Sequence, residues 1–386
     1  MTNNKSIKVV FFVPSFVVGG VENVFVNTLN ELLKGTNLDI SIVTHIKVRE
    51  PLYVDWLKSH PEIPVYTYFP LGHWFQNLEP KCRGILKLVR KITFSLYKRY
   101  RRFICRNRFK NMDVFIDYKN FEFYREFSYI KKPKIAWAHS ALSYFEQDKK
   151  FLKKTQEYNK IVCLTDDFME SFKEKYPEYA DKIVRIYNPI DAEQVRQKSL
   201  QENSPKGKYF CHVSRLDYGK DIKTLLDAFD IFYKSHKDVK LYIVGDGSLA
   251  KEHKDYAKTL EASKNIIFTG TQYNPYVLMK GAVANILSTD FEGLPTVVLE
   301  SVALGVPCIS SNCKSGPNEI LLGGKGGLLF EIGNAKMLAE KMTSVFLHPD
   351  TAQKLADEAS KGLTRFDPRG ISTQIKELIY GMVKGR

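Results

Sequence analysis

The stretch TDFEGLPTVVLESVALGVPCI, from Thr289 to Ile309, decides how the chain is interpreted. Its middle part is apolar or small on every side, which predicts a helix that is buried all round. Pro295 stands at the expected start of this helix, and Gly305 ends it. Glu300 is the one charged residue inside it. A carboxylate in such a place needs hydroxyl donors, a cation or a ligand, because an unpaired buried charge is strongly destabilising.

The residues ahead of this helix predict an anion site. Glu292 lies on a glycine-containing loop that leads directly into the helix. Free amides at the positive end of a helix, beside a tight glycine turn, suit a phosphate group. The backbone positions expected to form this site are Gly293, Leu294, Thr296 and Val297. Taken by itself, the segment is equally compatible with a core helix that holds one satisfied glutamate.

Length and charge indicate how many domains to expect and where the basic residues lie. A chain of 386 residues is too long for one ordinary core, so two domains are expected. The formal net charge is +15, and the segment from Lys81 to Lys110 holds twelve Lys or Arg and no Asp or Glu. One segment therefore makes the protein basic.

The six cysteines show neither a CxxC pair nor a histidine at metal spacing, which predicts reduced core thiols and no metal site. The apolar run after Lys5 is interrupted by Pro14 and lacks a small-x-small cleavage site, so no secretory signal is expected. No apolar run approaches the roughly 20 residues of a membrane-spanning helix. A cytoplasmic protein is the simplest interpretation.

Apolar, β-rich runs alternate with helical patterns in the first half of the chain. Near-continuous apolar strands between helices predict a parallel sheet covered on both faces, which binds ligands at the carboxyl ends of its strands. Gly19 and Gly20 follow one such strand and would let a backbone approach a ligand closely, although they are not a GxGxxG motif. His139 follows another strand. A lone histidine is more often structural, but this one stands where the fold places a substrate contact.

The basic segment has the pattern of one long amphipathic helix. Its apolar stripe consists of Ile85, Val89, Ile92, Leu96, Tyr100 and Phe103. Its cationic face consists of Arg83, Lys87, Arg90, Lys91, Lys98, Arg101 and Arg102. The simpler alternative is a packed helix with a solvated polar face, but such faces mix signs and this one has no acid.

We therefore expect the basic helix to contact anionic lipid headgroups or a polyanionic acceptor. The candidate residues for this contact are Lys87, Arg90, Lys91 and Arg101. Nucleic acid is the competing partner for a basic stripe, and no nucleic-acid-binding motif accompanies this one.

The second half of the chain predicts another domain of the same kind. Residues 191–208 form a polar stretch that is expected to link a domain of residues 1–190 to one of residues 209–365. Strand and helix patterns alternate again from residue 209, which indicates a second parallel α/β domain. Two such domains facing each other make a central cleft.

Two cations follow the first strand of this second domain. Arg215 and Lys220 lie between that strand and a helix, where they are placed to meet a diphosphate. Gly245 ends the next strand. As isolated residues, Arg215 and Lys220 are also compatible with ordinary surface charges.

With these residues assembled, the sequence resembles glycosyltransferase family 4, a family of retaining enzymes with the GT-B fold. The matching motifs run in order through most of the chain, and the combination of Arg, Lys and paired Glu is specific. The motifs are GG at Gly19 and Gly20, AHS at His139, YNPID at Asn188, SRLDYGKD with Arg215 and Lys220, VGDG at Gly245, FTG at Gly270, EGLPTVVLE with Glu292 and Glu300, and SGPNEI at Ser315 to Ile320. The segment from about Glu50 to Lys110 matches nothing that can be carried over in detail.

The resemblance implies roles for the charged residues. Glu300 would accept hydrogen bonds from the nucleotide ribose, and Glu292 would contact hydroxyls of the donor sugar. Arg215 and Lys220 would neutralise the departing diphosphate. The implied donor-binding positions are Gly19, Gly20, Gly245, Thr271, Gly293, Leu294, Thr296, Val297 and Glu300.

The remaining implications concern the reaction. His139 would contact the donor sugar from the N-terminal domain, and the backbone near Thr271 would read the base. The family pattern implies retention of the anomeric configuration, no required metal, and a last helix, at residues 366–386, that crosses back to the first domain. The chain has no Asp-x-Asp metal motif, in agreement with this.

The expected activity is transfer of a hexose or N-acetylhexosamine from a UDP-sugar. The expected acceptor is a lipid-linked saccharide or surface-polysaccharide precursor at the cytoplasmic face of the plasma membrane. The alternative is a non-catalytic binding subunit that keeps the GT-B shape and partners an active transferase. Intact Arg215, Lys220, Glu292 and Glu300 argue against that alternative, because such a subunit has no need of cations for a diphosphate.

Overall fold

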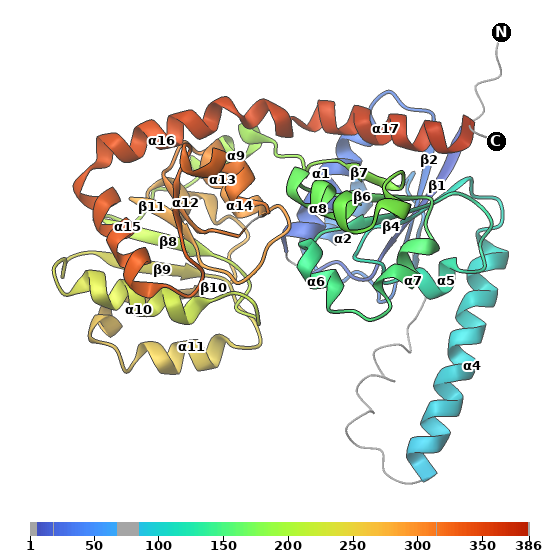
Figure 1. Ribbon diagram of the computed structural model, residues 1–386, viewed down its shortest axis with the longest axis horizontal. Coiled ribbons are helices and arrows are strands. Elements are labelled where there is room, and N and C mark those ends of the chain that lie inside the picture. The colour runs from blue at the N-terminus through green and yellow to red at the C-terminus, as the bar shows by residue number, and fades with distance from the viewer. Residues whose placement is uncertain (1–5, 18, 68–84, 314, 385–386) are drawn as a thin grey trace. The chain divides into compact units, whose positions relative to one another are not determined.

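The computed structural model describes residues 6–17, 19–67, 85–313 and 315–384. The chain divides into two units. Unit 1 comprises Met1–Cys163, Met169–Ile186 and Ser372–Arg386, and unit 2 comprises Leu164–Phe168 and Tyr187–Ile371. Each unit holds one parallel sheet with helices packed around it (Figure 1). The predicted α/β fold with two Rossmann-like, parallel-sheet domains is therefore confirmed.

The sheet of unit 1 has the strand order β3-β2-β1-β4-β5-β6-β7, with parallel pairing throughout the described strands. Its strands are β1 (Ile7–Val13), β2 (Leu38–Thr44), β3 (Val65–Thr67), β4 (Val114–Asp117), β5 (Lys134–Ala138), β6 (Lys160–Cys163) and β7 (Ile183–Arg185). Its helices include α1 (Gly20–Leu32), α2 (Pro51–Ser59), α4 (Ile85–Arg108), α5 (Tyr124–Phe127), α6 (Leu142–Glu146) and α7 (Phe151–Gln156), and α8 (Asp166–Lys175) begins in unit 2. The strand order reverses between β1 and β4, so the loops after these two strands flank the crevice where such sheets bind ligands.

Aromatic side chains hold the loop after β4 against the centre of this sheet. Phe12 of β1 is fully buried and meets the ring of Phe123 edge to face at 5.1 Å and that of Phe127 at 4.9 Å between centroids. Each such pair adds about 0.5–1.5 kcal/mol beyond the burial of its area. The backbone between β4 and α5 is thus fixed by core packing.

The sheet of unit 2 has the strand order β10-β9-β8-β11-β12-β13 and is also parallel. Its strands are β8 (Tyr209–Val213), β9 (Lys240–Val244), β10 (Ile266–Gly270), β11 (Ala284–Leu287), β12 (Cys308–Ser311) and β13 (Leu328–Phe330). Its helices include α9 (Ala192–Ser199), α10 (Ile222–Tyr233), α11 (Ala250–Ala257), α12 (Tyr276–Lys280), α13 (Thr296–Ala303), α14 (Pro317–Ile320), α15 (Ala335–Leu347) and α16 (Pro349–Lys361).

Neighbouring residues of β8 enter two different apolar clusters, because successive side chains of a strand point to opposite faces. Phe210 packs with residues of α10 and α15, whereas Tyr209 and Cys211 pack with residues of α12 and α13. Both faces of the sheet are therefore covered, as its unbroken apolar strands predict.

The polar stretch expected to be a linker contains a helix that belongs to unit 2. Asp191 caps α9, its carboxylate accepting a hydrogen bond of 2.9 Å from the amide of Gln194. Arg196 then donates to the carbonyl of Ala303 in α13 at 2.9 Å. One face of α9 therefore packs on unit 2 while the other stays polar and exposed, which is why the sequence of residues 191–208 has the pattern of a linker.

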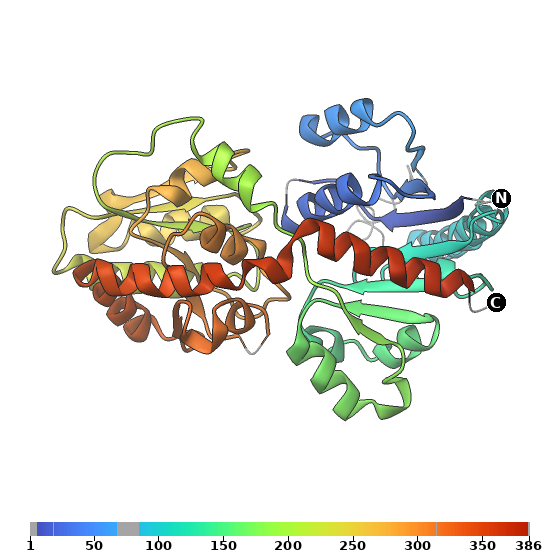
Figure 2. The ribbon, with the colours of Figure 1, turned by 90° about the horizontal axis from the view of Figure 1, so that it is seen from above.

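The last helix, α17 (Pro368–Lys384), begins in unit 2 and continues into unit 1 (Figures 1 and 2). Ile375 and Ile379 on this helix are buried. Lys376 donates to the carbonyl of Lys34, which follows α1, at 3.1 Å. The chain thus ends in contact with the unit in which it began.

Helix α4 carries its apolar stripe on the outside. Its C-terminal part is anchored in unit 1, since two residues there are buried. They are Cys105, inside the helix, and Phe109, just beyond its end. The exposed apolar side chains are Leu88, Val89, Ile92, Leu96, Tyr100 and Phe103, which are 49–65% exposed. The expected alternative of a helix packed through this stripe is therefore wrong. The side chain of Ile85, which was assigned to the same stripe, lies outside the described part of the chain.

Candidate functional site

The polar residues of unit 2 gather at the carboxyl edge of its sheet. Strands β8 and β11 are neighbours in the centre of the sheet and run in parallel, so the loops that follow them meet at one edge. The loop after β8 carries Arg215 and Lys220, and the loop after β11 carries Glu292. Residues that are far apart in the sequence become neighbours there.

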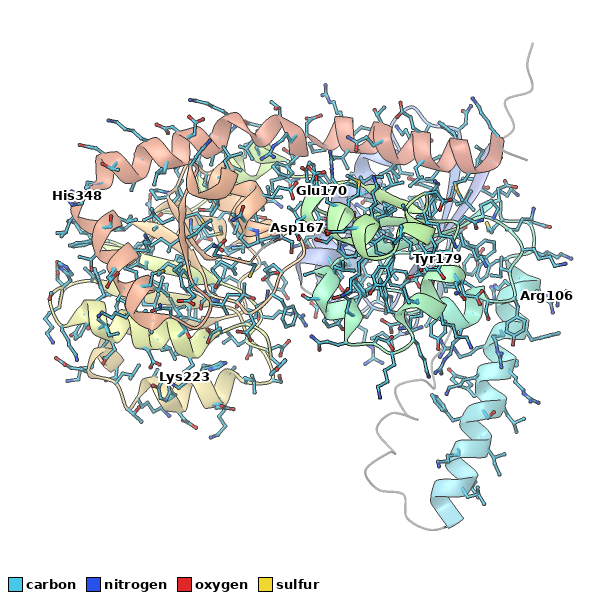
Figure 3. The ribbon with its side chains drawn as sticks, viewed as in Figure 1. Arg106, Asp167, Glu170, Tyr179, Lys223 and His348 are labelled. Atoms are coloured by element: carbon cyan, nitrogen blue, oxygen red, sulfur yellow. The ribbon has the colours of Figure 1, made fainter. Side chains whose placement is uncertain are left out.

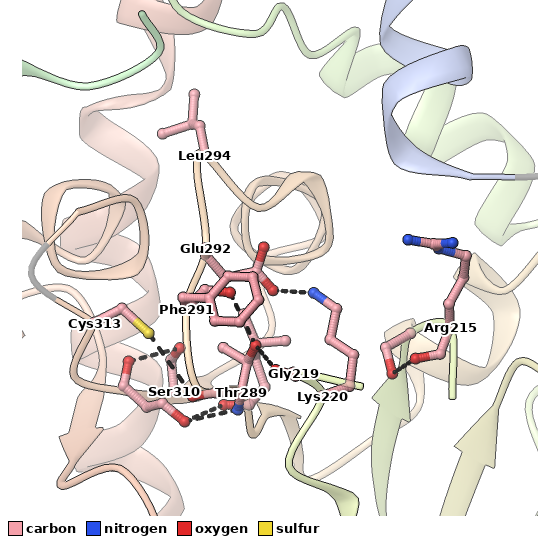
Figure 4. Close-up of polar contacts among 12 residues, drawn as sticks. Arg215, Gly219, Lys220, Thr289, Phe291, Glu292, Leu294, Ser310 and Cys313 are labelled. Carbon is pink, nitrogen blue, oxygen red and sulfur yellow. Dashed lines mark hydrogen bonds and ion pairs between the residues drawn. The ribbon is translucent and has the colours of Figure 1, made fainter. Parts of the chain in front are cut away.

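An ion pair joins Lys220 to Glu292 (Figure 4). The Lys220 side chain is 23% exposed and that of Glu292 is 13% exposed, so the pair is largely but not fully removed from water. Two hydrogen bonds also join the loop that carries Lys220 to the loop that carries Glu292. The hydroxyl of Thr289 donates to the carbonyl of Gly219 at 2.8 Å, and the amide of Asp290 donates to the same carbonyl at 3.0 Å. The structure thus brings together one predicted cation and one predicted carboxylate.

Two glycines allow this close contact between loops. Gly219 has a φ of +85°, and a Cβ on it would lie 2.8 Å from the ring of Phe291. Gly316 has a φ of +68°, and a Cβ there would lie 2.1 Å from the carbonyl oxygen of Gly293. Ser315, next to Gly316, donates to the carbonyl of Glu292 at 3.0 Å. A larger side chain at either glycine would displace the backbone that carries the ion pair.

Arg215 lies in the same loop as Lys220 but has a different partner. Its side chain is 64% exposed and pairs with Asp217 at 3.1 Å. The amide and hydroxyl of Ser248 each donate to the Asp217 carboxylate at 2.8 Å. These bonds, together with Arg215, lower the pKa of Asp217 below its usual value. In the structure, Arg215 is held beside the loop after β9 and is not joined to the ion pair of Lys220.

The loops after β9 and β10 supply backbone. Gly245 has a φ of +131°, and a Cβ on it would lie 1.9 Å from the carbonyl oxygen of Ser214, so only glycine fits there. Its amide donates to the carbonyl of Gly270 at 2.9 Å. Thr271 follows directly and is exposed. The ends of β8, β9 and β10, marked by Ser214, Gly245 and Gly270, therefore lie together beside Arg215.

Glu300 lies on α13 and is partly buried. The hydroxyl of Tyr276 on α12 donates to its Oε1 atom at 3.3 Å. Burial raises the pKa of Glu300 to about 7, although this hydrogen bond opposes the shift. Burial and the nearby carboxylate also raise the pKa of Tyr276 above its usual value. A carboxylate with one neutral partner has acceptor capacity left for hydroxyl donors.

The N-terminus of α13 faces the same edge. Pro295 occupies the N-cap position without a side-chain cap. The amides of Val298 and Leu299 donate to the Pro295 carbonyl, whereas within the described residues no acceptor meets the amides of Thr296 and Val297. Free amides at this end of a helix favour an anion.

In unit 1 the predicted glycines lie beside a carboxylate that the sequence did not reveal. Gly19 precedes α1, and a Cβ on it would lie 2.9 Å from Oε2 of Glu22. Glu22 is buried and forms an ion pair with Lys119 at 2.9 Å. The positive end of α1 is thus already met by a carboxylate, whereas Gly19 and Gly20 were expected to bind the donor there.

His139 lies after β5 and is held by its own loop neighbours. Its Nε2 atom lies 2.9 Å from the carbonyl oxygen of Tyr118, and its amide donates to Oδ1 of Asn120 at 2.7 Å. Burial, together with the charge of Lys119, lowers the pKa of His139 to about 3 in spite of the bond to Tyr118. The imidazole is therefore neutral over the physiological range of pH.

The basic residues of α4 differ in their exposure and in their partners. Lys91 is exposed, and the side chains of Lys87 and Arg90 lie outside the described part of the chain. Arg101 is only 14% exposed and pairs with Glu126 of α5 at 2.8 Å. The structure thus gives Arg101 a role inside unit 1, in contrast to the membrane or acceptor contact expected of it.

Three further residues of the site were assigned no role from the sequence. Asp217 lies within the SRLDYGKD motif, whereas Ser248 and Tyr276 lie outside the motifs. They support Arg215 and Glu300 through contacts that form only when loops from different strands meet. The only available signal was their position after strands. Among the residues the structure describes, no three His, Cys, Asp or Glu side chains gather in a way that could hold a metal ion. In the same residues, no helix is long and apolar enough to cross a membrane.

Comparison with known proteins defines the class to which this fold and site are similar. The model of a family described as glycosyl transferases group 1 matches residues 193–362. Mutant TarM of S. aureus, solved with Fondaparinux, alpha-GlcNAc-glycerol and UDP, superimposes with a TM-score of 0.74 at 14% identity, covering 97% of this chain and 99% of that one. Anabaena HepE in complex with UDP-glucose gives a TM-score of 0.72 at 19% identity, covering 97% and 100%.

Curated relatives are similar over part of their length. A lipopolysaccharide 1,6-galactosyltransferase of Salmonella typhimurium is 31% identical over 158 residues, which are 40% of this chain and 43% of that protein. An N-acetylgalactosaminyltransferase of Campylobacter jejuni, acting on N-acetylgalactosamine-N,N'-diacetylbacillosaminyl-diphospho-undecaprenol, is 28% identical over 196 residues, 51% of this chain and 53% of that protein. The chain thus spans about half of each relative, and the resemblance to glycosyltransferases is confirmed for the segment that contains the unit 2 site.

Proposed function

We propose that this protein is a retaining, metal-independent glycosyltransferase. It transfers a hexose or an N-acetylhexosamine from a UDP-sugar to a lipid-linked saccharide or surface-polysaccharide precursor. The observation that carries the proposal is the joint presence of Lys220, Glu292 and Glu300 at one sheet edge, inside the segment similar to glycosyl transferases group 1.

The chemistry follows from where negative charge develops. When the anomeric C–O bond of a nucleotide sugar breaks, the bonding electrons pass to the β-phosphate oxygen. Lys220, Arg215 and the free amides of α13 are cationic or positively polarised groups at the sheet edge that would receive this charge. One well-placed donor of this kind is worth about 100- to 1000-fold in rate. Glu292 now neutralises Lys220, and it would be released to meet sugar hydroxyls once a diphosphate takes its place.

Glu300 is the expected nucleoside contact. Its carboxylate receives one hydrogen bond from Tyr276 and retains acceptor capacity for the hydroxyls of a ribose. The structural neighbour HepE binds UDP-glucose, which supports a uridine nucleotide as the donor.

A panel of nucleotide sugars tests the donor. Thermal unfolding is measured with UDP-, GDP- and ADP-sugars, for the wild type and for Lys220→Ala. A ligand at a hundredfold its dissociation constant adds about 2.7 kcal/mol to the free energy of unfolding. We expect a raised midpoint with a UDP-sugar in the wild type and a smaller shift in the variant. A folded wild type that responds to no nucleotide sugar would favour the non-catalytic binding subunit instead.

The acceptor side of the proposal is membrane-linked and rests on α4. This helix exposes a stripe of six large apolar side chains, and its sequence carries basic residues with no acid. Figure 3 shows the side chains along it, with Arg106 labelled near its C-terminal end. An apolar stripe flanked by cations is the pattern of a helix that lies in the interface of an anionic membrane. We therefore place the protein peripherally at the cytoplasmic face of the plasma membrane, where a lipid-linked acceptor is available.

Liposome flotation tests the membrane contact. The variant Leu96→Ser/Tyr100→Ser removes apolar area, and Lys91→Glu/Arg99→Glu reverses exposed charge on the same helix. Both are expected to weaken binding to vesicles with anionic headgroups at least fivefold, because apolar burial and headgroup attraction act together. Leu347→Ser, an exposed apolar residue on α15, is the control. Undiminished flotation of both α4 variants would refute the membrane contact.

A further inference from the structure

Unit 2 has a pocket at the edge of its sheet that lies opposite the candidate site. Strands β8, β11 and β12 are parallel neighbours, so their amino ends lie together at the edge away from Lys220 and Glu292. Residues just before these strands, the end of α15 and the start of α16 line a pocket of about 370 Å³ there. Sites for small molecules have volumes of about 300–1,000 Å³, so this pocket is large enough for a small ligand.

The walls of this pocket are apolar and belong to the core of unit 2. Four wall residues, Ala282, Val306, Val345 and Ala352, are buried. The ring of Phe346 completes the wall, and it packs edge to face on the ring of the buried Phe232 at 5.5 Å between centroids. Core packing fixes these side chains, so the apolar surface is present before any ligand binds.

The charges at this pocket have one sign. Lys208 and Lys280 line it and are exposed, and no Asp or Glu is among the described residues that line it. The ammonium of Lys208 lies over the apolar wall, 4.5 Å from the centre of the Phe346 ring. Gln353 is the other polar side chain of the lining, and its amide nitrogen already donates to two acceptors, at 3.1 and 2.9 Å. The side-chain donors left to meet a ligand are thus two ammonium groups.

This combination selects among classes of ligand. A sugar or a nucleotide would bury hydroxyl groups against an apolar wall that offers them no partner. A peptide strand would bury backbone amides there, and the wall side chains offer these amides no acceptor. A cationic head would be repelled by the two lysines. An apolar tail gains free energy from burial, and an anionic head gains it from charge-assisted hydrogen bonds to the lysines.

We propose that this pocket binds a single-chain amphiphile with an anionic head, its tail against the apolar wall and its head facing Lys208 and Lys280. A carboxylate and a phosphate monoester are two heads with this chemistry. The site does not depend on the proposed function, because every lining residue belongs to unit 2 and lies at the edge opposite Lys220 and Glu292.

The first test varies the ligand. Calorimetry is performed on the full chain with decyl phosphate and decanoate, both below the concentrations at which they form micelles. At least one of them is expected to bind saturably in a one-to-one complex, and the tighter of the two identifies the head. Inorganic phosphate and decanol are expected to bind about tenfold more weakly or less, because each lacks one half of the interaction. Equal affinity for decanol, or no binding of either anionic amphiphile, would overturn the proposal.

The second test varies the rim of the pocket. Lys208→Glu/Lys280→Glu is expected to weaken binding of the anionic amphiphile about tenfold, since both partners of its head are reversed in charge. Lys240→Glu is the matched control, because Lys240 is an exposed lysine at the start of β9, on the same sheet edge, and does not line the pocket. It is expected to keep the wild-type affinity within threefold. An equal loss in both variants would reduce the effect to general surface charge and overturn the site.

Helix α4 is also basic and apolar on its surface, so a third variant separates it from the pocket. Leu96→Ser/Tyr100→Ser is expected to bind the single amphiphile as the wild type does. Loss of binding in this variant, with binding retained in Lys208→Glu/Lys280→Glu, would assign the amphiphile to α4 and contradict the pocket. None of the probes is a nucleotide, so each outcome is independent of whether the protein binds a UDP-sugar.

Discussion

The carboxyl edges of the two sheets hold polar groups of two different kinds. In unit 2, Lys220 and Glu292 pair in a partly exposed position, and among the described residues Glu300 accepts one hydrogen bond, from the neutral hydroxyl of Tyr276. In unit 1, Glu22 is buried against Lys119, and His139 is neutral and tied to its own loop. The first edge can exchange partners when an anion arrives, whereas the second holds its groups in place. We interpret the first edge as the one able to receive an anionic ligand, in line with the proposed function.

Removing the cation of the exchangeable edge should have the largest effect. Lys220→Ala is expected to lower the rate of UDP release from the donor about 100- to 1000-fold, because charge on the leaving phosphate loses its main partner. The rate is measured with the UDP-sugar found by thermal shift. Lys223→Ala, which removes an exposed lysine paired with Asp227 on α10, is the control. Equal rates for Lys220→Ala and Lys223→Ala would contradict the role of Lys220 as the cation that meets the departing diphosphate.

The backbone behind the ion pair should be the next most sensitive feature. Gly316→Ala places a Cβ 2.1 Å from the Gly293 carbonyl at a φ of +68°. Gly323→Ala has a similar φ of +65° and meets nothing within 4 Å. We expect Gly323→Ala to cost about 1 kcal/mol in free energy of unfolding and Gly316→Ala roughly 2–3 kcal/mol, measured with urea. Equal costs for the two variants would mean that the loop at Gly316 can move to accommodate a Cβ, and that the backbone supporting the ion pair of Lys220 is not rigid.

Glu300 is expected to lower the stability of the empty protein while it supports binding of the donor. Burial raises its pKa to about 7 from 4.5, so the cost of the ionised carboxylate is absent below the unfolded value and fully present above pH 7. Glu300→Gln is therefore expected to raise the free energy of unfolding of the empty protein by about 3 kcal/mol at pH 8 and to have little effect at pH 4. Urea unfolding at the two pH values measures this difference.

The same carboxylate should make donor binding depend on pH. Affinity for a UDP-sugar is expected to fall about tenfold between pH 8 and pH 6, as Glu300 gains a proton and loses acceptor capacity. The phosphates of a nucleotide sugar are diesters that do not titrate in this range, so the change reports the protein. A flat profile in the wild type, or an equal fall in Glu300→Gln, would assign the effect to another group.

The smallest expected effect belongs to Tyr276. Tyr276→Phe removes only the hydroxyl that orients Glu300, and its bond of 3.3 Å is long. We expect donor affinity to fall three- to fivefold, measured by calorimetry, with the pKa of Glu300 moving further upward. A loss as large as that of Glu300→Gln would show that Tyr276 itself contacts the nucleoside.

The sequence predicted the parts of the molecule that are local. Strand patterns gave the parallel sheets, and the motifs around Lys220, Glu292 and Glu300 placed these residues after strands, where the structure brings Lys220 and Glu292 into contact. Residues 191–208 were predicted to be a linker because one face of α9 is polar, and the other face of this helix is recognisable only from its packing on α13.

The parts that depend on contacts between distant loops were not predictable. Nothing in the sequence pairs Glu22 with Lys119, or Asn120 with His139, because these bonds form only once the ends of β1, β4 and β5 are aligned. The sequence made no prediction of the orientation of α4, for a related reason. Its period gives the position of the stripe on the helix, whereas Arg101 and its bond to Glu126 determine which side of the helix faces the protein.

Calorimetric titration of UDP and of uridine into the wild type, Lys220→Ala and Glu300→Gln tests the central claim most directly. We predict that the wild type binds UDP more tightly than uridine, that Lys220→Ala reduces the affinity for UDP to that for uridine, and that Glu300→Gln weakens both ligands. Wild-type affinities for UDP in both variants, or no binding of UDP to the folded wild type, would contradict a nucleotide-sugar site at the carboxyl edge of unit 2.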